Sequence, residues 1–201
     1  MVNKNTRSKR LYSDSNIRKK ESLRKTFLQK RKNISLNFSE YSEFIANNLI
    51  FLLRTYPNLK NKKSIGLYWQ LGSEVNTRPA IAALNEYKFN ISLLSSEDKN
   101  FKFRKWNINT IIKKNTLGYL ISGSIMKFPK IIVCPILSFD EECNRLGRGG
   151  GHYDRFLKSY QNSFKIGLAY NDQLAKNVYP EDHDVKMDVI VTERKIYTRK
   201  N

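Results

Sequence analysis

Short apolar runs alternate with helical segments along the chain, and this alternation restricts the possible folds more than any other feature of the sequence. Five runs have the length of buried strands: Ser64–Trp69, Ile91–Ser95, Lys130–Phe139, Phe164–Tyr170 and Val189–Thr192. Helices are expected between them, over Thr77–Tyr87, Gly151–Tyr160 and Asn171–Val178. The pattern predicts the α/β class, as a three-layer, Rossmann-like sandwich with a mainly parallel sheet and helices on both faces.

Two more helices are expected ahead of the first strand. Asp14 or Ser15 can cap a helix that runs to about Lys32, and Ser39 can cap a second one. Residues 1–13 are basic and show no apolar periodicity, so we expect a flexible basic arm there and a single α/β domain over residues 14–201. In such domains ligands bind at the carboxyl ends of strands, which directs attention to the loops after Trp69, after Phe139 and before Val189.

The charge balance indicates an anionic partner. Lys and Arg number 37 against 18 Asp and Glu, a formal net charge of +19. Nucleic acids, anionic lipids and small phosphates or carboxylates are the usual partners of so basic a protein. An RNA-binding protein is therefore an alternative from another class, although the chain has neither an RNP1-like aromatic cluster nor a zinc knuckle, and half of the excess charge lies in residues 1–35.

Composition excludes several other classes. Apolar residues make up 40% of the 201 residues, enough for one sizeable core. The longest apolar run, Ile131–Leu137, is far shorter than a membrane span, and the N-terminus carries no apolar signal segment. Two cysteines, Cys134 and Cys143, exclude a disulfide framework. We expect a cytoplasmic protein without a membrane partner.

The most informative segment is a loop rich in glycine and arginine, Asn144–Arg155, with the sequence NRLGRGGGHYDR. It follows the strongest strand and opens a helix, an arrangement that suits phosphate binding because glycine amides can surround an anion at a helix start. It is no Walker A loop, since Gly-Lys-Ser/Thr is missing, and no dinucleotide fingerprint, since His152 replaces the last glycine. A polyphosphate site is the favoured interpretation, and a flexible basic turn is the alternative.

This loop and three other segments resemble the 5-formyltetrahydrofolate cyclo-ligase family, whose members are also called 5,10-methenyltetrahydrofolate synthetases. The other segments are KESLR (Lys20–Arg24), YWQLGSEVNTRP (Tyr68–Pro79) and PEDHDVKMDVIVTE (Pro180–Glu193). The four blocks stand in the family's order and cover nearly the whole chain. One departure is His152, where the family usually carries an aromatic residue, mostly tyrosine. From Asn100–Lys127, which matches weakly, no residue is carried over.

The resemblance implies a reaction and a set of site residues. The family converts 5-formyltetrahydrofolate and ATP, with Mg²⁺, to 5,10-methenyltetrahydrofolate, ADP and phosphate, through phosphorylation of the formyl oxygen. It assigns ATP to Lys20, Arg24, Arg145, Leu146, Gly147, Arg148, Gly149, Gly150, Gly151, His152 and Tyr153. It assigns the folate to Glu74, Arg148 and Tyr153. The candidates for Mg²⁺ are Asp154, directly after the phosphate loop, and Asp184, in the loop before the last strand, whereas Asp188 is expected to start or cap that strand. Arg148 is expected nearest the transferring phosphate.

For several of these residues the sequence leaves a structural role open. Lys20 and Arg24, spaced i and i+4, could form a solvated basic helix face instead of an anion clamp. Glu74 could be an acid in the first turn of a helix, and Asp154 could serve the dipole of its own helix. His183 is as reasonable a support for Asp184 as a catalyst.

Partners and rival functions follow from the same resemblance. The expected partners are ATP and the folate, with or without a polyglutamate tail. No specific nucleic acid partner is expected, and the protein is expected to be a monomer. Besides RNA binding, a relative of sugar-phosphate isomerases or CoA transferases remains an alternative, because similar folds carry different functions.

Overall fold

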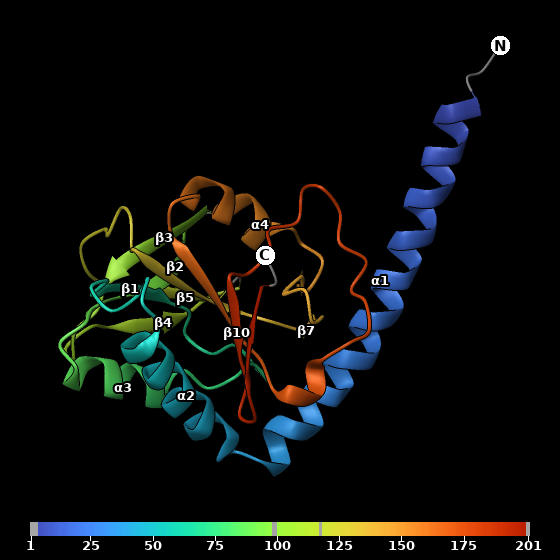
Figure 1. The fold of residues 1–201 in the computed structure, drawn as a ribbon. Helices are drawn as coiled ribbons and strands as arrows, with labels where there is room; N and C mark the ends of the chain where they lie inside the picture. Colours follow the sequence, from blue (N-terminus) through green and yellow to red (C-terminus); the bar gives the residue numbers. More distant parts are fainter. Residues whose placement is uncertain (1–3, 98–99, 117, 200–201) are drawn as a thin grey trace.

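A seven-stranded sheet with the order β11-β10-β9-β6-β1-β2-β3 forms the centre of the molecule (Figure 1). The computed structural model describes residues 4–97, 100–116 and 118–199, and of residues 4–14 the backbone alone. The strands of the sheet are β1 (Ser64–Leu67), β2 (Asn90–Glu97), β3 (Asn100–Lys105), β6 (Ile131–Pro135), β9 (Phe164–Leu168), β10 (Val189–Val191) and β11 (Ile196–Thr198). The five inner strands are parallel, and only β3 and β11, at the two edges, run antiparallel to their neighbours.

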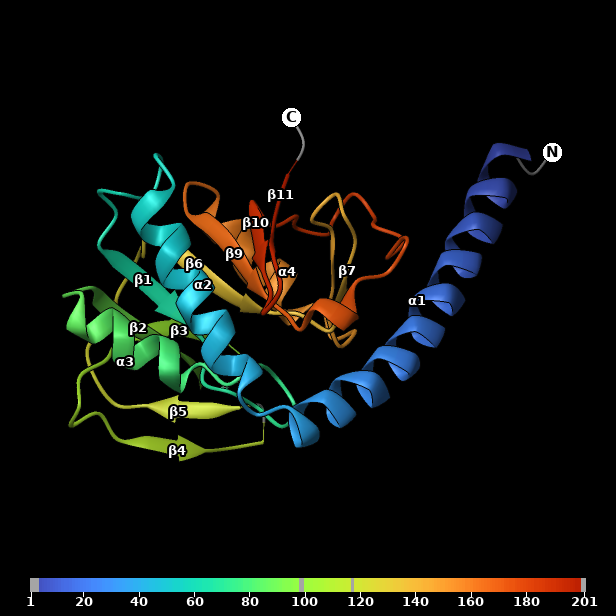
Figure 2. The same cartoon turned by 60° about the horizontal axis from the view of Figure 1, so that its bottom comes forward.

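Helices cover both faces of this sheet, so the predicted three-layer α/β architecture is confirmed. On one face lie α2 (Tyr41–Thr55) and α3 (Arg78–Glu86), and on the other lies α4 (His152–Leu157) (Figure 2). A 3₁₀ turn, η1 (Lys158–Tyr160), extends α4, and a second one, η2 (Asn171–Gln173), follows β9.

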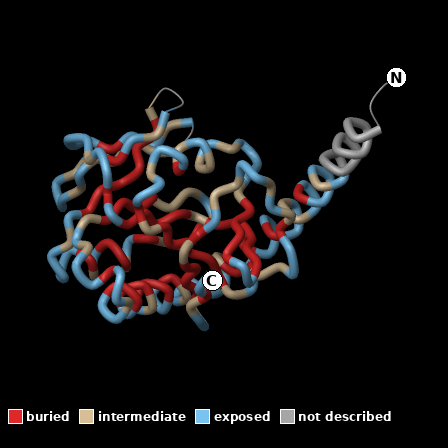
Figure 3. The backbone as a smooth tube through the Cα atoms, turned by 45° about the horizontal axis from the view of Figure 1, so that its top comes forward, coloured by how far each residue is buried: buried red, intermediate tan, exposed pale blue. Residues whose placement is uncertain are grey.

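The core consists of two apolar layers, one on each side of the sheet, visible as the buried inner segments of the chain (Figure 3). Along β6, Ile131 and Val133 contribute to the layer under α2 and α3, whereas Ile132 and Cys134 contribute to the layer under α4. This alternation follows from the pleat of a strand, whose successive side chains point to opposite faces. Because both faces are covered, the strand is apolar throughout, which is why the sequence shows a continuous run.

Helix α1 (Lys4–Asn37) packs against the body with its C-terminal part and projects away from it with its N-terminal part (Figures 1 and 2). Its predicted start at Asp14 or Ser15 and its predicted end at Lys32 are both wrong. The chain contains no Gly or Pro before Pro57, so nothing in the sequence interrupts the helix early. The backbone is helical from Lys4, residues 1–3 lie outside the described residues, and a separate N-terminal arm stays a prediction. Among the described residues no helix is both long and apolar enough to cross a bilayer.

Two predicted elements differ from the structure. The run Lys130–Phe139 is not one strand: β6 ends at Pro135, which has no N–H to continue a ladder, and Ser138–Phe139 forms β7, paired with β8 (Arg145–Leu146). The helix predicted over Asn171–Val178 is only the short turn η2. Tertiary hydrogen bonds replace it, because the backbone N–H of Ala175 donates to the carbonyl of Phe139 at 2.7 Å.

The region between β2 and β6 contains strands that the sequence pattern did not predict. They are β3, which forms an edge of the main sheet, and the separate hairpin of β4 (Ile112–Lys114) and β5 (Tyr119–Ile121). β3 and β4 are rich in Lys, Arg and Asn and are mostly half-buried or exposed, and β5 has only three residues. A search for apolar runs therefore misses them.

The packing of Phe103 on β3 against Gly66 on β1 can be tested by substitution. The ring of Phe103 on β3 covers Gly66 so closely that an added Cβ would lie 2.5 Å from Phe103 Cε1. We predict that Gly66→Ala lowers the free energy of unfolding by about 1–3 kcal/mol, measured by urea denaturation, because the core has no room for the methyl group.

Phe103→Leu is the matched variant. If the two side chains collide, Phe103→Leu should cost less stability in the Gly66→Ala background than in the wild type. Equal costs in the two backgrounds would contradict the packing described.

Candidate functional site

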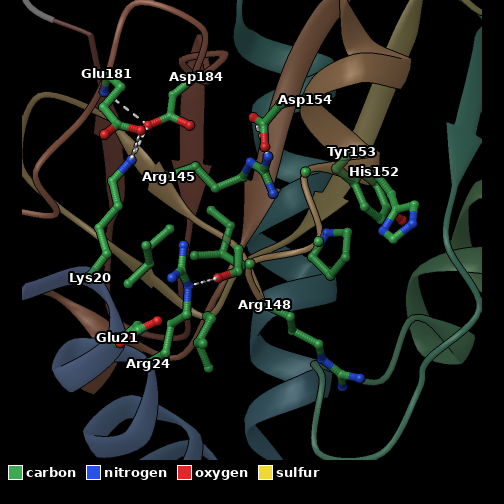
Figure 4. A pocket seen from close by; sticks show the side chains of 18 of the residues that line it. Lys20, Glu21, Arg24, Arg145, Arg148, His152, Tyr153, Asp154, Glu181 and Asp184 are labelled. Carbon is green, nitrogen blue, oxygen red and sulfur yellow. Dashed lines mark hydrogen bonds and ion pairs between the residues drawn. The ribbon is translucent and has the colours of Figure 1, made fainter. Parts of the chain in front are cut away.

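A cavity of about 460 Å³ lies at the carboxyl edge of the sheet, between the glycine-arginine loop and the C-terminal part of α1. The three loops singled out from the sequence all contribute to it, with Glu74 after β1, Arg145–Asp154 after β6, and Asp184 ahead of β10. Every residue predicted for ATP, folate or metal lines this cavity (Figure 4 labels most of them). The structure thus brings together four segments that are far apart in the sequence.

The glycine-arginine loop adopts a backbone that requires glycine at two positions. Gly149 and Gly151 have φ values of 102° and 62°, in the left-handed region that side chains disfavour. A Cβ on Gly149 would also lie 3.3 Å from the guanidinium of Arg24, so the loop and α1 approach closely only because that Cβ is missing. Arg24 holds this contact by donating from Nε to the carbonyl oxygen of Gly147 at 3.2 Å.

Lys20 reaches across the cavity mouth from α1 to the loop before β10. Its ammonium donates to Asp184 Oδ2 at 2.7 Å and to Glu181 Oε2 at 3.1 Å, and the residue is only 5% exposed (Figure 4). A solvated basic helix face is therefore wrong for Lys20. Its spacing of four residues from Arg24 instead points both side chains into one cavity.

Around this ammonium lie three groups that could coordinate a cation. Ligand atoms of Glu181, His183 and Asp184 all lie within 4.8 Å of one another. Burial acts to raise the pKa of Asp184, but hydrogen bonds from Lys20 and from the backbone N–H of Glu181 outweigh it and hold this pKa below its ordinary value. Asp184 therefore stays ionised, as a metal ligand must. The side chain of His183 is exposed, and its Nε2 lies 3.6 Å from Asp184 Oδ1. His183 therefore contacts the two carboxylates from the solvent side.

Asp154 is held by a second ion pair. Its Oδ1 accepts from Arg145 Nη2 at 2.6 Å and from the backbone N–H of Val185 at 3.2 Å. Asp154 thus ties α4 to the loop before β10, and its predicted role as a metal ligand stays a prediction. Arg145 is 6% exposed, and its Nε is buried without a hydrogen-bond partner among the described residues, so it retains a donor for a ligand.

At the other end of the cavity lies Glu74, which is 8% exposed. Its Oε2 accepts from the backbone N–H of Leu71 at 3.0 Å, and its Oε1 lies 3.3 Å from Arg148 Nη2. Burial raises the pKa of Glu74, while Arg148 and Arg31 act to lower it. Glu74 belongs to a loop, since α3 begins only at Arg78, so the first-turn alternative is wrong. The guanidinium of Arg148 reaches toward this carboxylate rather than toward Lys20.

A narrow aromatic extension of about 70 Å³ opens beside Glu74. Its ring-bearing walls are Tyr68, Trp69, Phe101, Tyr119 and Tyr153. Burial raises the pKa of Tyr153 well above its ordinary value, so its hydroxyl stays protonated and can donate. The exposed ring of His152 meets Phe101 edge-on, with 6.0 Å between the ring centroids, so it keeps an aromatic contact in place of the family's usual tyrosine.

Sequence reasoning missed several of these side chains, among them Glu181. Phe101 and Tyr119 lie in the weakly matching region, and no pattern in the sequence marks them. Arg31 follows Arg24 by seven residues, a helical spacing that could have placed it on the same face of α1 as Lys20 and Arg24. Asp188, the remaining acidic candidate, has the structural role expected for it, because its Oδ2 accepts from the backbone N–H of Lys165 at 2.7 Å.

The sequence matches one protein family and is similar to known proteins of that name. The model of the 5-formyltetrahydrofolate cyclo-ligase family matches residues 16–193. The 5-formyltetrahydrofolate cyclo-ligase of Escherichia coli K12 is 35% identical over 156 residues, 72% of this chain and 86% of that protein. The protein of the same name from Haemophilus influenzae is 28% identical over 189 residues, 88% of this chain and 99% of that protein.

Two solved structures are similar to the fold of this chain. The 5,10-methenyltetrahydrofolate synthetase of Aquifex aeolicus superimposes with a TM-score of 0.74 at 27% identity, covering 90% of this chain and 93% of that one. The synthetase of Mycoplasma pneumoniae gives a TM-score of 0.66 at 25% identity, covering 87% and 98% of the two chains.

The ion pair between Lys20 and Asp184 should affect how the stability of the fold depends on pH. Because the pKa of Asp184 is lowered on folding, its carboxylate stabilises the fold above its unfolded-state pKa of about 4, and this contribution is lost as the pH falls through the lowered value. We predict that Asp184→Asn lowers the free energy of unfolding at pH 7 by about 1–2 kcal/mol, allowing for partial solvent screening. Its stability should also fall less steeply below pH 4 than that of the wild type.

Urea denaturation at several pH values measures both effects. Asp182→Asn, which alters an exposed acid in the same loop, is the control and should leave the pH dependence unchanged. An Asp184→Asn variant as stable as the wild type at pH 7 would contradict the prediction.

Proposed function

The chain belongs to the 5-formyltetrahydrofolate cyclo-ligase family, and we propose that it converts 5-formyltetrahydrofolate and ATP to 5,10-methenyltetrahydrofolate, ADP and phosphate. One observation carries this proposal beyond family membership. A single cavity joins a glycine-rich loop surrounded by cationic side chains to a buried carboxylate beside an aromatic extension. The first part suits a polyphosphate, and the second suits a flat heterocycle with hydrogen-bond donors on its edge.

In the proposed reaction, the formyl oxygen attacks the γ-phosphorus of ATP and ADP departs. The phosphorylated oxygen is then a good leaving group, so N10 adds to the formyl carbon, loses its proton and expels phosphate. The carbon is left as a bridge between N5 and N10. Such a transfer asks the protein mainly to position the reactants and to neutralise charge.

Four cationic side chains can supply that charge. Lys20, Arg24, Arg145 and Arg148 line the cavity around the loop, and Arg145 has a free Nε. Lys20 must leave its carboxylates to reach a phosphate, so a cation that replaces it there would preserve the charge balance. Asp184, with Glu181 beside it, offers the oxygen donors that Mg²⁺ prefers, and bound Mg²⁺ would neutralise phosphate charge.

The geometry of α1 supports separate ends for the two substrates. Lys20 and Arg24 lie beside the glycine-arginine loop, whereas Arg31 lies eleven residues beyond Lys20, about 16 Å along a helix axis, beside the loop that carries Glu74. We assign the ATP phosphates to the first end and the pterin ring to the second. Tyr153, which lines both the cavity and its aromatic extension, would contact the folate.

The proposal includes a cellular setting. Cys134 and Cys143 are free and buried, which is compatible with a reducing cytoplasm. The basic surface can attract a polyglutamate tail, so its charge requires no nucleic acid partner. We propose a monomeric enzyme, since one chain by itself supplies a cavity with both a cationic and an aromatic part.

An ATP-dependence assay tests the proposed function. Protein, Mg²⁺ and 5-formyltetrahydrofolate are mixed with and without ATP, and the methenyl product is followed by its absorbance. We expect product only when ATP is present, together with stoichiometric ADP. Product without ATP, or none with it, would overturn the proposal.

Glu74→Gln should act on the folate alone. The substitution keeps the shape of the side chain but removes the charge that would pair with the donors of the pterin edge. We predict that the Kd for 5-formyltetrahydrofolate rises about tenfold while the Kd for ATP is unchanged, measured by titration calorimetry. Glu86→Gln, an exposed acid on α3, is the control. A loss of ATP affinity instead would contradict the assignment of the two ends.

Arg24→Gln should have the reciprocal effect. Its guanidinium lies against the loop assigned to the phosphates, so we predict that the Kd for ATP rises about tenfold or more while folate affinity holds. Lys25→Gln removes the same charge from the exposed neighbouring position and should change neither constant. Equal effects of the two variants would show that Arg24 acts only through the general field of the helix.

A further inference from the structure

Arg31 is a buried cation with one unpaired nitrogen. The residue is 1% exposed and lines the main cavity. Its Nε donates to Ser73 Oγ at 3.2 Å and its Nη1 donates to the carbonyl oxygen of Ile136 at 3.1 Å. Its Nη2 is buried and has no hydrogen-bond partner among the described residues. Hydrogen bonds from two nitrogens therefore fix the orientation of the guanidinium, and the third nitrogen is left for another group.

An unused donor of this kind is unusual in a folded protein. Buried polar groups are nearly always paired, and a charged group that is not fully paired is especially unfavourable. Burial accordingly lowers the pKa of Arg31, and the nearby carboxylate of Glu74 partly compensates for it. An unpaired nitrogen on a firmly held residue that lines a ligand cavity points to an acceptor that the ligand itself supplies.

The surroundings of Arg31 indicate which part of the ligand that acceptor belongs to. Ser73, which anchors Arg31, directly precedes Glu74 in the loop after β1. A guanidinium donor and a carboxylate acceptor therefore lie at the same end of the cavity, away from the contact of Arg24 with Gly147. A heterocyclic lactam with an adjacent amino group carries the matching edge, an oxygen acceptor followed by two N–H donors.

We infer that Arg31 is a substrate-binding residue whose Nη2 donates to the 4-oxo oxygen of the pterin ring, while Glu74 accepts from the ring N3–H and the 2-amino group. The inference rests on the proposed function, because it takes 5-formyltetrahydrofolate as the ligand. Arg31 and Glu74 would together form hydrogen bonds with both the acceptor and the donors of one ring edge. A phosphate would instead meet the cations at the far end, and a flexible glutamate tail would not need a donor so deeply buried.

The test compares ligand affinities of Arg31→Gln and wild-type protein by titration calorimetry. We expect the Kd for 5-formyltetrahydrofolate to rise about ten- to hundredfold, the loss typical of a charge-assisted hydrogen bond, and the Kd for ATP to stay within about twofold. The same factor should be lost for 5-formyltetrahydropteroate, which lacks the glutamate. Lys32→Gln, which removes an exposed charge one position along α1, should change none of these constants.

Arg31→Lys is a second variant that tests the inference if Arg31→Gln does not fold. A single ammonium keeps the charge but cannot make all three contacts, so folate affinity should fall while ATP affinity and the melting temperature change little. A loss confined to ATP, a loss seen with 5-formyltetrahydrofolate but not with the pteroate, or a lowered melting temperature with both affinities intact would each overturn the inference. A wild-type protein that binds no 5-formyltetrahydrofolate would instead overturn the proposed function itself, and the inference with it.

Discussion

The structure of the site depends on the way in which α1 docks onto the body through buried cationic side chains. Lys20 meets carboxylates of the loop before β10, Arg24 meets the carbonyl of Gly147, and Arg31 meets the carbonyl of Ile136. A guanidinium or ammonium brought out of water must find acceptors, so these three contacts fix both the position of the helix and its rotation about its axis. Without them the cavity would have no wall on this side and the glycine-arginine loop would face solvent.

Three of the cations in the site are each paired with a carboxylate of the site itself. Lys20 pairs with Asp184, Arg145 with Asp154, and Arg148 with Glu74. Breaking a buried pair by removing one partner is costly, so an anionic ligand enters most readily when it exchanges with a carboxylate rather than leaving it alone. The unpaired Nε of Arg145 and Nη2 of Arg31 are the exceptions, and they mark positions where a ligand adds a bond without breaking one.

Much of the fold and site could be predicted from the sequence, for identifiable reasons. Buried parallel strands are continuous apolar runs, so the inner strands and the α/β class are predictable. The glycines of the glycine-arginine loop indicate its left-handed backbone. The edge strand β3 and the strand β4 are polar and β5 has only three residues, so no apolar run marks them, although each pairs with a neighbour in the sequence. Phe101 and Tyr119 belong to these strands and were therefore not predicted. The ion pair of Lys20 could not be predicted either, because Asp184 is 164 residues away in the sequence.

The central claim is that one cavity binds polyphosphate at the Lys20 end of α1 and the pterin ring at the Arg31 end. A crystal structure with a non-hydrolysable ATP analogue and 5-formyltetrahydrofolate tests it most directly. We expect phosphate oxygens within hydrogen-bond distance of Arg24 and of the loop amides, with the pterin edge between Arg31 and Glu74. Phosphates found against Arg31, or a pterin ring stacked beside Lys20, would contradict it.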